Sequence, residues 1–216
     1  MIQGPYTIED NQKREDRTEL IDGNIFKMKL YLPIYAQVLR ALYVMMATHI
    51  GSEKTGAKIY QFVGVQLDKD EKTCMVPDLC VVIDSQKLEG GKFVVGAPEM
   101  IVEILGSDVG DRRRDLTVKV EKYAAAGVRE YWILDPEHER MMVYDFTKEV
   151  PTLPEIHSFA EEVPVKVFKD LLNDEWAVSF PELQNKVQKF FEVQKLTKEV
   201  RERRKQKYIK IVRDFT

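Results

Sequence analysis

The segment that decides the fold covers residues 98–136 and reads PEMIVEILGSDVGDRRRDLTVKVEKYAAAGVREYWILDP. It opens on an apolar strand, in which Glu103 is the one charge amid isoleucine, valine and leucine side chains. A helix is predicted over residues 111–126, because Gly127 directly after it is a favourable C-cap. The run VREYWILD then predicts another strand. A strand, a helix and a strand therefore form the centre of the expected fold.

Further strands are expected on both sides of this unit. They lie at residues 58–68, 74–84 and 140–146, with two weaker strands between residues 155 and 168. Pro77 indicates an edge, a bulge or a bend in the second of them, since proline cannot donate a ladder hydrogen bond. The stretch over residues 87–96 is rich in glycine and is expected to be a loop.

The helical segments complete the predicted architecture. A short helix is expected at residues 7–16, with Thr7 as its N-cap, and a longer helix at residues 33–50. Between them, Asp22-Gly23 indicates the turn of a β-hairpin. The order of elements predicts an α/β fold, in which helices flank both faces of a mixed central sheet. One domain over residues 1–180 is expected, followed by a long amphipathic and basic helix over residues 181–216.

The C-terminal helix carries an apolar stripe and a basic run. The stripe is expected to dock on the domain or on a second subunit, and the run RERRKQK is either a solvated helix face or an arm that contacts phosphates. The stripe consists of Leu183, Val187, Phe190 and Phe191.

Composition narrows the class of protein. A chain of 216 residues with 44% hydrophobic and 32% charged residues can bury a core without disulfides or a structural metal. Cys74 and Cys80 are too far apart on one strand, roughly 20 Å, to bridge each other. The N-terminus lacks the pattern of a secretory signal, and the sequence contains no run of ~20 apolar residues that could span a membrane. A cytoplasmic location is therefore expected.

Charge is unevenly distributed along the chain. The net charge of −3 argues against a basic coat for nucleic acid. The consecutive Arg112, Arg113 and Arg114 nevertheless form a local basic cluster that is suited to phosphate contacts.

Two carboxylates and a lysine carry the expected chemistry. Asp78 follows the proline of an apolar strand, and Glu103 lies in the middle of another. On the next helix, Asp115, Lys119 and Tyr123 recur every four residues and so share one face. Two buried carboxylates on neighbouring strands repel each other unless a cation lies between them, and oxygen ligands alone point to Mg²⁺ or Mn²⁺. A nearby lysine would stabilise charge on an attacked phosphate.

Each of these residues also has a purely structural interpretation. Asp78 could cap a turn, Glu103 could form a salt bridge with Arg112 or Lys119, and Lys119 could lie on a solvated helix face. The aromatic pair Tyr131 and Trp132 is expected to belong to the core.

The same residues resemble a known family. The runs PDLCVVID, GAPEMIVEILGSD and RRRDLTVKVEKYAAAGVREYWILDP are similar to the Uma-two family of restriction endonucleases, within the PD-(D/E)XK nuclease superfamily. The resemblance covers about residues 17–146 and is most specific at Pro77-Asp78, at Glu103-Ile104-Leu105 and between Asp115 and Pro136. It implies a restriction-endonuclease-like core.

The resemblance also implies roles for particular residues. Asp78 and Glu103 would be metal ligands, with the backbone carbonyl of Ile104 as a third, and Glu19 matches an acidic residue of the family. The superfamily usually places a lysine two residues after the second acid, where this chain has Leu105; the resemblance implies that Lys119 replaces it. The loop Gly106-Ser107-Asp108 departs from the Ser-Pro that the family often carries.

The sequence therefore leads to a Mg²⁺-dependent endonuclease, with DNA as the expected substrate and a homodimer as the expected assembly by analogy with the superfamily. Asp78, Glu103 and Lys119 would be its catalytic residues, supported by Glu19, Asp115 and Tyr123. One alternative is a catalytically inactive module of the same fold that binds nucleic acid or assembles. A weaker alternative is a glycoside hydrolase with paired carboxylates, which would need a deep aromatic cleft.

Overall fold

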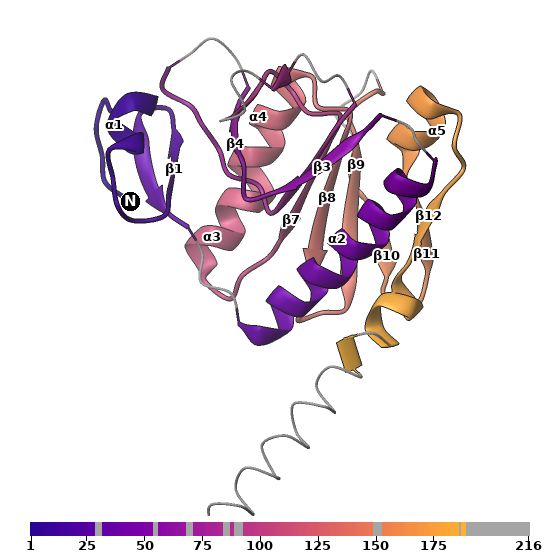
Figure 1. The fold of residues 1–216 in the computed structure, drawn as a ribbon. Coiled ribbons are helices and arrows are strands. Elements are labelled where there is room, and N and C mark those ends of the chain that lie inside the picture. Colours follow the sequence, from indigo (N-terminus) through magenta and orange to yellow (C-terminus); the bar gives the residue numbers. More distant parts are fainter. Residues whose placement is uncertain are drawn as a thin grey trace, which may run out of the picture.

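The computed structural model describes residues 1–28, 32–53, 56–67, 71–83, 87–88, 93–148, 153–185 and 187–188. Its centre is a six-stranded sheet in the order β10-β9-β8-β7-β5-β3 (Figure 1). Within it β7 and β8 run parallel and the other neighbours are antiparallel, which confirms the predicted mixed sheet. The strands are β3 (Lys58–Gln61), β5 (Leu79–Val82), β7 (Met100–Ile104), β8 (Glu130–Asp135), β9 (Arg140–Asp145) and β10 (Glu155–Ser158).

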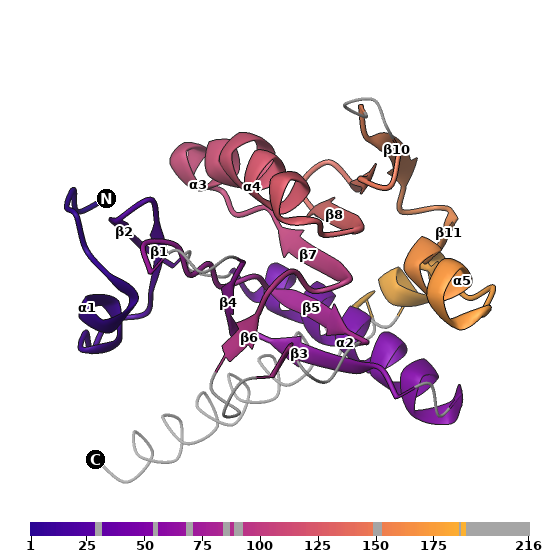
Figure 2. The same cartoon turned by 90° about the horizontal axis from the view of Figure 1, so that it is seen from above.

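Strand β7 is buried along its whole length because both faces of the sheet are covered. Val102 and Ile104 point into one hydrophobic core, whereas Ile101 and Leu105 point into the other. Figure 2 shows the sheet lying between two helical layers. Helices on both faces were predicted, and the prediction is confirmed.

Helix α2 (Pro33–Glu53) covers the first face, joined by α5 (Lys166–Leu172) and by the small antiparallel sheet of β11 (Glu162–Pro164) and β12 (Ala177–Ser179). Leu183 is fully buried in this core and Val187 nearly so, which confirms that the start of the C-terminal segment docks on the domain. Phe190, Phe191 and the basic run lie outside the described residues.

The second face is covered by a helix in three parts. They are α3 (Val109–Arg113), the π-helical turn η3 (Arg114–Val118) and α4 (Lys119–Ala126). The prediction of one regular helix over residues 111–126 missed the π turn and the earlier start. Gly127 ends the helix in the left-handed conformation with φ 90°, as predicted.

A small N-terminal lobe lies beside the sheet (Figures 1 and 2). It contains α1 (Ile8–Gln12), capped by Thr7, and the hairpin of β1 (Thr18–Ile21) and β2 (Asn24–Lys27). Asp22 and Gly23 form its turn with φ of 49° and 73°, so the predicted hairpin is confirmed. A bridge between Leu20 and Cys74 ties the lobe to the main domain.

Two expectations about the segment before β7 were wrong. The run over residues 58–68 is not one strand, because the positive φ of Phe62 (53°) breaks it into β3 and β4 (Gly64–Gln66). The expected loop at residues 87–96 contains β6 (Phe93–Val95), which pairs parallel with β4. The glycines of this stretch led to the prediction of a loop, whereas its Phe-Val-Val run forms the strand that pairs with β4.

Both cysteines are free and buried, as expected. Tyr131 and Trp132 are fully buried, which confirms their assignment to the core. Among the described residues, no helix combines the length and the apolar character that crossing a membrane requires.

Candidate active site

The two predicted metal ligands lie beside the same end of the β5–β7 ladder. Strands β5 and β7 pair so that Leu79 is opposite Val102 and Cys80 is opposite Ile101. Asp78 directly precedes β5, and Glu103 directly follows Val102 on β7. Glu103 alternates with Val102 and Ile104, so its side chain lies on the face of the sheet that α3, η3 and α4 cover.

Asp78 is held at the bend that follows Pro77. Its Oδ2 accepts a hydrogen bond of 2.6 Å from the backbone N–H of Ile104. Asp78 and Glu103 are both fully buried. The bend predicted from Pro77 therefore places an acidic side chain against the end of β7.

Lys119 lies at the centre of a buried ionic cluster. Its Nζ is 2.7 Å from Oε1 of Glu103, 3.0 Å from Oε2 of Glu19 and 3.3 Å from Oδ1 of Asp115. These three carboxylates come from β7, β1 and η3, so three separate elements meet at one ammonium group. The side chain of Lys119 is only 3% exposed. The interpretation of Lys119 as a solvated helix residue is therefore wrong.

Arg114 extends this cluster toward the surface. Its Nε donates to Oε1 of Glu19 at 2.8 Å, and its Nη2 donates to Oδ1 of Asp111 at 2.8 Å. The guanidinium also lies over the ring of Phe26 on β2, 5.0 Å from the ring centroid. Arg114 thus joins the N-terminal lobe to the helix that carries Lys119.

The electrostatics of the cluster keep Lys119 charged. Burial alone would lower its pKa, but the carboxylates of Glu103, Glu19 and Asp115 outweigh burial and raise the pKa well above the ordinary lysine value. The site therefore presents a protonated amine at neutral pH.

Two tyrosines pack below the cluster. Burial raises the pKa of Tyr123 well above its usual value, so its phenol is neutral. Among the described residues its hydroxyl has no hydrogen-bond partner. The ring of Tyr131 meets it edge-to-face at 5.0 Å, and the hydroxyl of Tyr131 donates to the backbone oxygen of Asp115. The predicted supporting residues Glu19, Asp115 and Tyr123 thus all surround Lys119.

The three consecutive arginines do not form one patch. Arg112 points to Asp135, with Nη2 2.9 Å from Oδ2, whereas one structural interpretation had expected it at Glu103. Arg114 is held by Glu19 and Asp111, and Arg113 alone is exposed. Of the three, Arg113 has the exposure that a phosphate contact needs.

The donor set suits a hard divalent cation. Asp78 and Glu103 offer carboxylate oxygens near the end of β7, and the carbonyl of Ile104 belongs to the residue that already bonds Asp78. Oxygen ligands of this kind, completed by water, are what Mg²⁺ and Mn²⁺ prefer. Among the described residues, the group that brings three ligand atoms within 4.8 Å of one another is a different one, Asp135, Glu137 and His138. Arg112 and Arg140 already occupy Asp135 there.

Access to the cluster is narrow. A recess of about 10 Å³, room for roughly one water molecule, is lined by Glu19, Lys119 and Asp115 together with Met28, Val76 and Arg114. Arg114 and Met28 also line a much larger groove of about 860 Å³ outside it. The recess is too small for a phosphate in this conformation.

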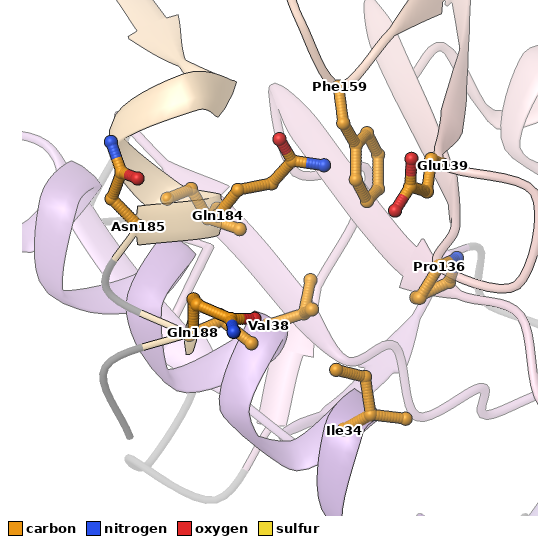
Figure 3. Close-up of a pocket in the computed structure, with 10 residues that line it drawn as sticks. Ile34, Val38, Pro136, Glu139, Phe159, Gln184, Asn185 and Gln188 are labelled. Atoms are coloured by element: carbon orange, nitrogen blue, oxygen red, sulfur yellow. The ribbon is translucent and has the colours of Figure 1, made fainter. Parts of the chain in front are cut away.

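A separate cavity of about 360 Å³ lies on the other face of the sheet, between α2 and the segment that starts the C-terminal helix (Figure 3). Ile34, Val38 and Phe159 line it together with amide side chains, and Glu139 is the one titratable group among the described residues of its wall. It therefore lacks the grouped acids and bases that hydrolysis requires.

Sequence reasoning missed the partners of Glu19 and the groove beside it. The Arg114–Glu19 ion pair joins residues that are 95 positions apart, and no local sequence pattern in either segment predicts it. The run of arginines at 112–114 indicated phosphate contacts. It gave no sign that Arg112 and Arg114 form structural ion pairs.

Comparisons with known proteins show the family and the fold of the chain. The model of the Uma2 family, described as "Putative restriction endonuclease", matches residues 6–175. A search of curated proteins gave no match. Among solved structures, a "putative nuclease belonging to DUF820" from Anabaena variabilis aligns with a TM-score of 0.66 at 19% identity, covering 85% of this chain and 99% of the other. At that identity the likeness is one of fold.

Proposed function

The chain belongs to the Uma2 family of restriction-endonuclease-like proteins, and from that premise we propose that it is a divalent-metal-dependent endonuclease that hydrolyses nucleic-acid phosphodiester bonds, with DNA as its expected substrate. One observation carries the proposal. Lys119 reaches Glu103 from the covering helix at 2.7 Å, and Asp78 accepts a hydrogen bond from the backbone N–H of Ile104, the residue after Glu103. Acidic and basic side chains that are far apart in the sequence thus gather around the end of β7.

The residues divide into two roles. Asp78, Glu103 and the carbonyl of Ile104 would hold Mg²⁺ or Mn²⁺, an ion that polarises a phosphoryl oxygen and lowers the pKa of water. Lys119 is protonated and would stabilise the negative charge that develops on the attacked phosphate. Glu19 and Asp115 position its ammonium group, and Tyr123 packs against it.

Metal binding and cleavage are tested together on single variants. We expect Asp78→Ala and Glu103→Ala to lose Mn²⁺ binding in calorimetry and to lose plasmid cleavage. The matched control is Asp135→Ala, which removes the buried acid of the other group able to gather ligand atoms. Unchanged Mn²⁺ affinity in the Asp78 variant, or loss of it in the Asp135 variant alone, would contradict the assignment.

A second candidate is an inactive module that binds nucleic acid or assembles. The closed state of the cluster favours it, because the side chains of Glu103 and Lys119 are 0% and 3% exposed and form a direct ion pair. An enzyme must open this pair toward the substrate, whereas a module need not. Nucleic-acid binding without Mn²⁺ binding or cleavage at any metal concentration would select the module.

Assembly and location are further parts of the proposal. A homodimer would bring two sites to two strands, and light scattering coupled to gel filtration measures this directly. Cytoplasmic location would be tested by fractionation of cells that express the protein.

A further inference from the structure

A long groove runs beside the candidate active site. Its one wall is the end of the β1–β2 hairpin, and its other wall is the segment from Gly106 to Val118. We call it the hairpin groove. Its volume of about 860 Å³ lies within the range of ligand-binding pockets, ~300–1,000 Å³.

The hairpin groove leads to the ionic cluster. Arg114 and Met28 line both the groove and the small recess at Lys119, so they separate the two. The side chain of Arg114 is 10% exposed, whereas those of Glu19 and Lys119 are 3% exposed. Of the cluster's cations, Arg114 is therefore the one that lies nearer the groove.

The walls of the groove combine cationic and apolar groups. Lys27 and Arg113 are exposed on opposite walls, and Phe26 also lines the groove, under the guanidinium of Arg114. Of the acids at the groove, Asp111 is paired with Arg114, and Asp108 accepts a hydrogen bond as the N-cap of α3. Cations along a groove with an aromatic ring beside them are the features with which proteins bind unpaired nucleic-acid strands.

Stiffness decides between a duplex and a single strand. Duplex DNA bends appreciably only over ~150 base pairs, so its phosphates stay on the outside of a rigid rod. Its backbone can meet a groove only along a nearly straight line. A single strand can turn at each nucleotide and follow the groove to Arg114.

We propose that the hairpin groove binds an unpaired nucleic-acid strand, with Lys27 and Arg113 contacting its phosphates. The proposal rests on the proposed function, because it names the form of substrate that this site admits. The favoured substrates are then nucleic acids that offer a single-stranded region, a flap or a loop.

Binding in the absence of metal tests the groove separately from catalysis. Fluorescence anisotropy in EDTA compares a labelled 20-nucleotide oligothymidylate with a duplex of equal length. We expect the single strand to bind about tenfold more tightly or better, and we expect the double variant Lys27→Ala/Arg113→Ala to weaken that binding about tenfold. The slope of log affinity against log salt concentration should become shallower by about 0.7 for each phosphate that the variant leaves without its cation.

The matched control is Arg40→Ala. Arg40 is exposed on α2, which covers the opposite face of the sheet, so its removal changes the net charge without touching the groove. Equal or tighter binding of the duplex, or equal losses in the groove and control variants, would overturn the proposal.

Failures of the two proposals are distinguishable. If the wild-type protein binds the single strand but cleaves nothing under any metal condition, the endonuclease proposal fails and the groove stands. If duplex is cleaved efficiently while single strands do not bind, the endonuclease stands and the groove proposal is wrong.

Discussion

Lys119 is a buried cation that three carboxylates share. Three carboxylates surround its ammonium group within 3.3 Å, and each comes from a different element. An ion pair this buried contributes little net stability, but removal of one partner leaves the others without compensation. The cluster as a whole adds little stability, yet none of its members can be removed cheaply. Such an arrangement is typical of a functional site.

Replacement of Lys119 by methionine should be strongly destabilising. We expect a loss of about 3–5 kcal/mol in the free energy of unfolding at pH 7, measured by urea denaturation, because Glu103, Glu19 and Asp115 lose their shared cation.

Lys122 provides the control on the same helix. Its side chain is 26% exposed and pairs with the exposed Asp22. Lys122→Met should therefore cost about 1 kcal/mol or less. Equal losses for the two lysines would show that burial of Lys119 has no special weight.

At this scale the sequence offered one contact of the cluster, the ion pair between Glu103 and Lys119, which the structure contains. The bend after Pro77 and the apolar setting of Glu103 selected Asp78 and Glu103 as candidates, and the family resemblance selected Lys119. The partners of Glu19 were not predictable, because the N-terminal hairpin reaches the helix only in the folded chain. Burial of the whole cluster also followed from this packing, which no local pattern encodes.

Glu130 shows how one strand fixes a helix in another layer. The residue before α5 is Val165, whose side chain cannot cap the helix. Glu130 on β8 supplies the missing acceptor, since its Oε2 accepts from the backbone N–H of Val167 at 2.9 Å. Its Oε1 accepts from the indole of Trp132 at 2.7 Å. A strand side chain therefore holds the start of α5 on the sheet.

This carboxyl makes stability depend on pH. Burial raises the pKa of Glu130 from 4.5 to about 7, although its hydrogen bonds to Val167 and Trp132 act in the opposite direction. The folded protein thus binds this proton more tightly than the unfolded chain. The corresponding stability is fully present below pH 4.5 and is lost as pH rises through 7.

Glu130→Gln should remove this dependence. Between about pH 5 and 8 the wild-type free energy of unfolding should fall by about 2–3 kcal/mol more than that of the variant, as measured by urea denaturation at each pH. Parallel pH profiles for the two proteins would contradict a raised pKa at this residue.

The π-helical turn is the element that sequence patterns could not give. Residues 114–118 carry no glycine or proline, and their apolar spacing suits a regular helix. The turn changes the rotation between α3 and α4, so that Arg114 faces Glu19 while Lys119 faces Glu103. Such turns are frequent at functional sites, and this one lies inside the candidate site.

For the whole molecule, the apolar runs of the sequence predicted the sheet and its two helical layers. Strands β7 and β8 are mostly apolar and are buried at every position, which is typical of a sheet covered on both faces. The lobe formed by α1 and the hairpin was expected as elements, but its place beside α3 was not. The hairpin groove exists only because of that placement, so it could not be foreseen.

The two native thiols can report how this molecule opens. Burial raises the pKa of Cys74 to about 11 and that of Cys80 to about 12, and the charges of Glu19 and Glu99 add to these shifts. Because the thiolate is the reactive form, both should resist disulfide reagents in the folded protein. Cys74 packs with the buried apolar residues of the lobe, whereas Cys80 lies on β5 of the central sheet.

Single-thiol variants turn this difference into a kinetic measurement. If the lobe detaches before the sheet opens, Cys80→Ala should react through Cys74 faster than Cys74→Ala reacts through Cys80 in mild denaturant. Identical labelling rates would mean that lobe and sheet open in a single cooperative event. Cysteines introduced at the surface could then be labelled with spectroscopic probes while Cys74 and Cys80 stay unlabelled.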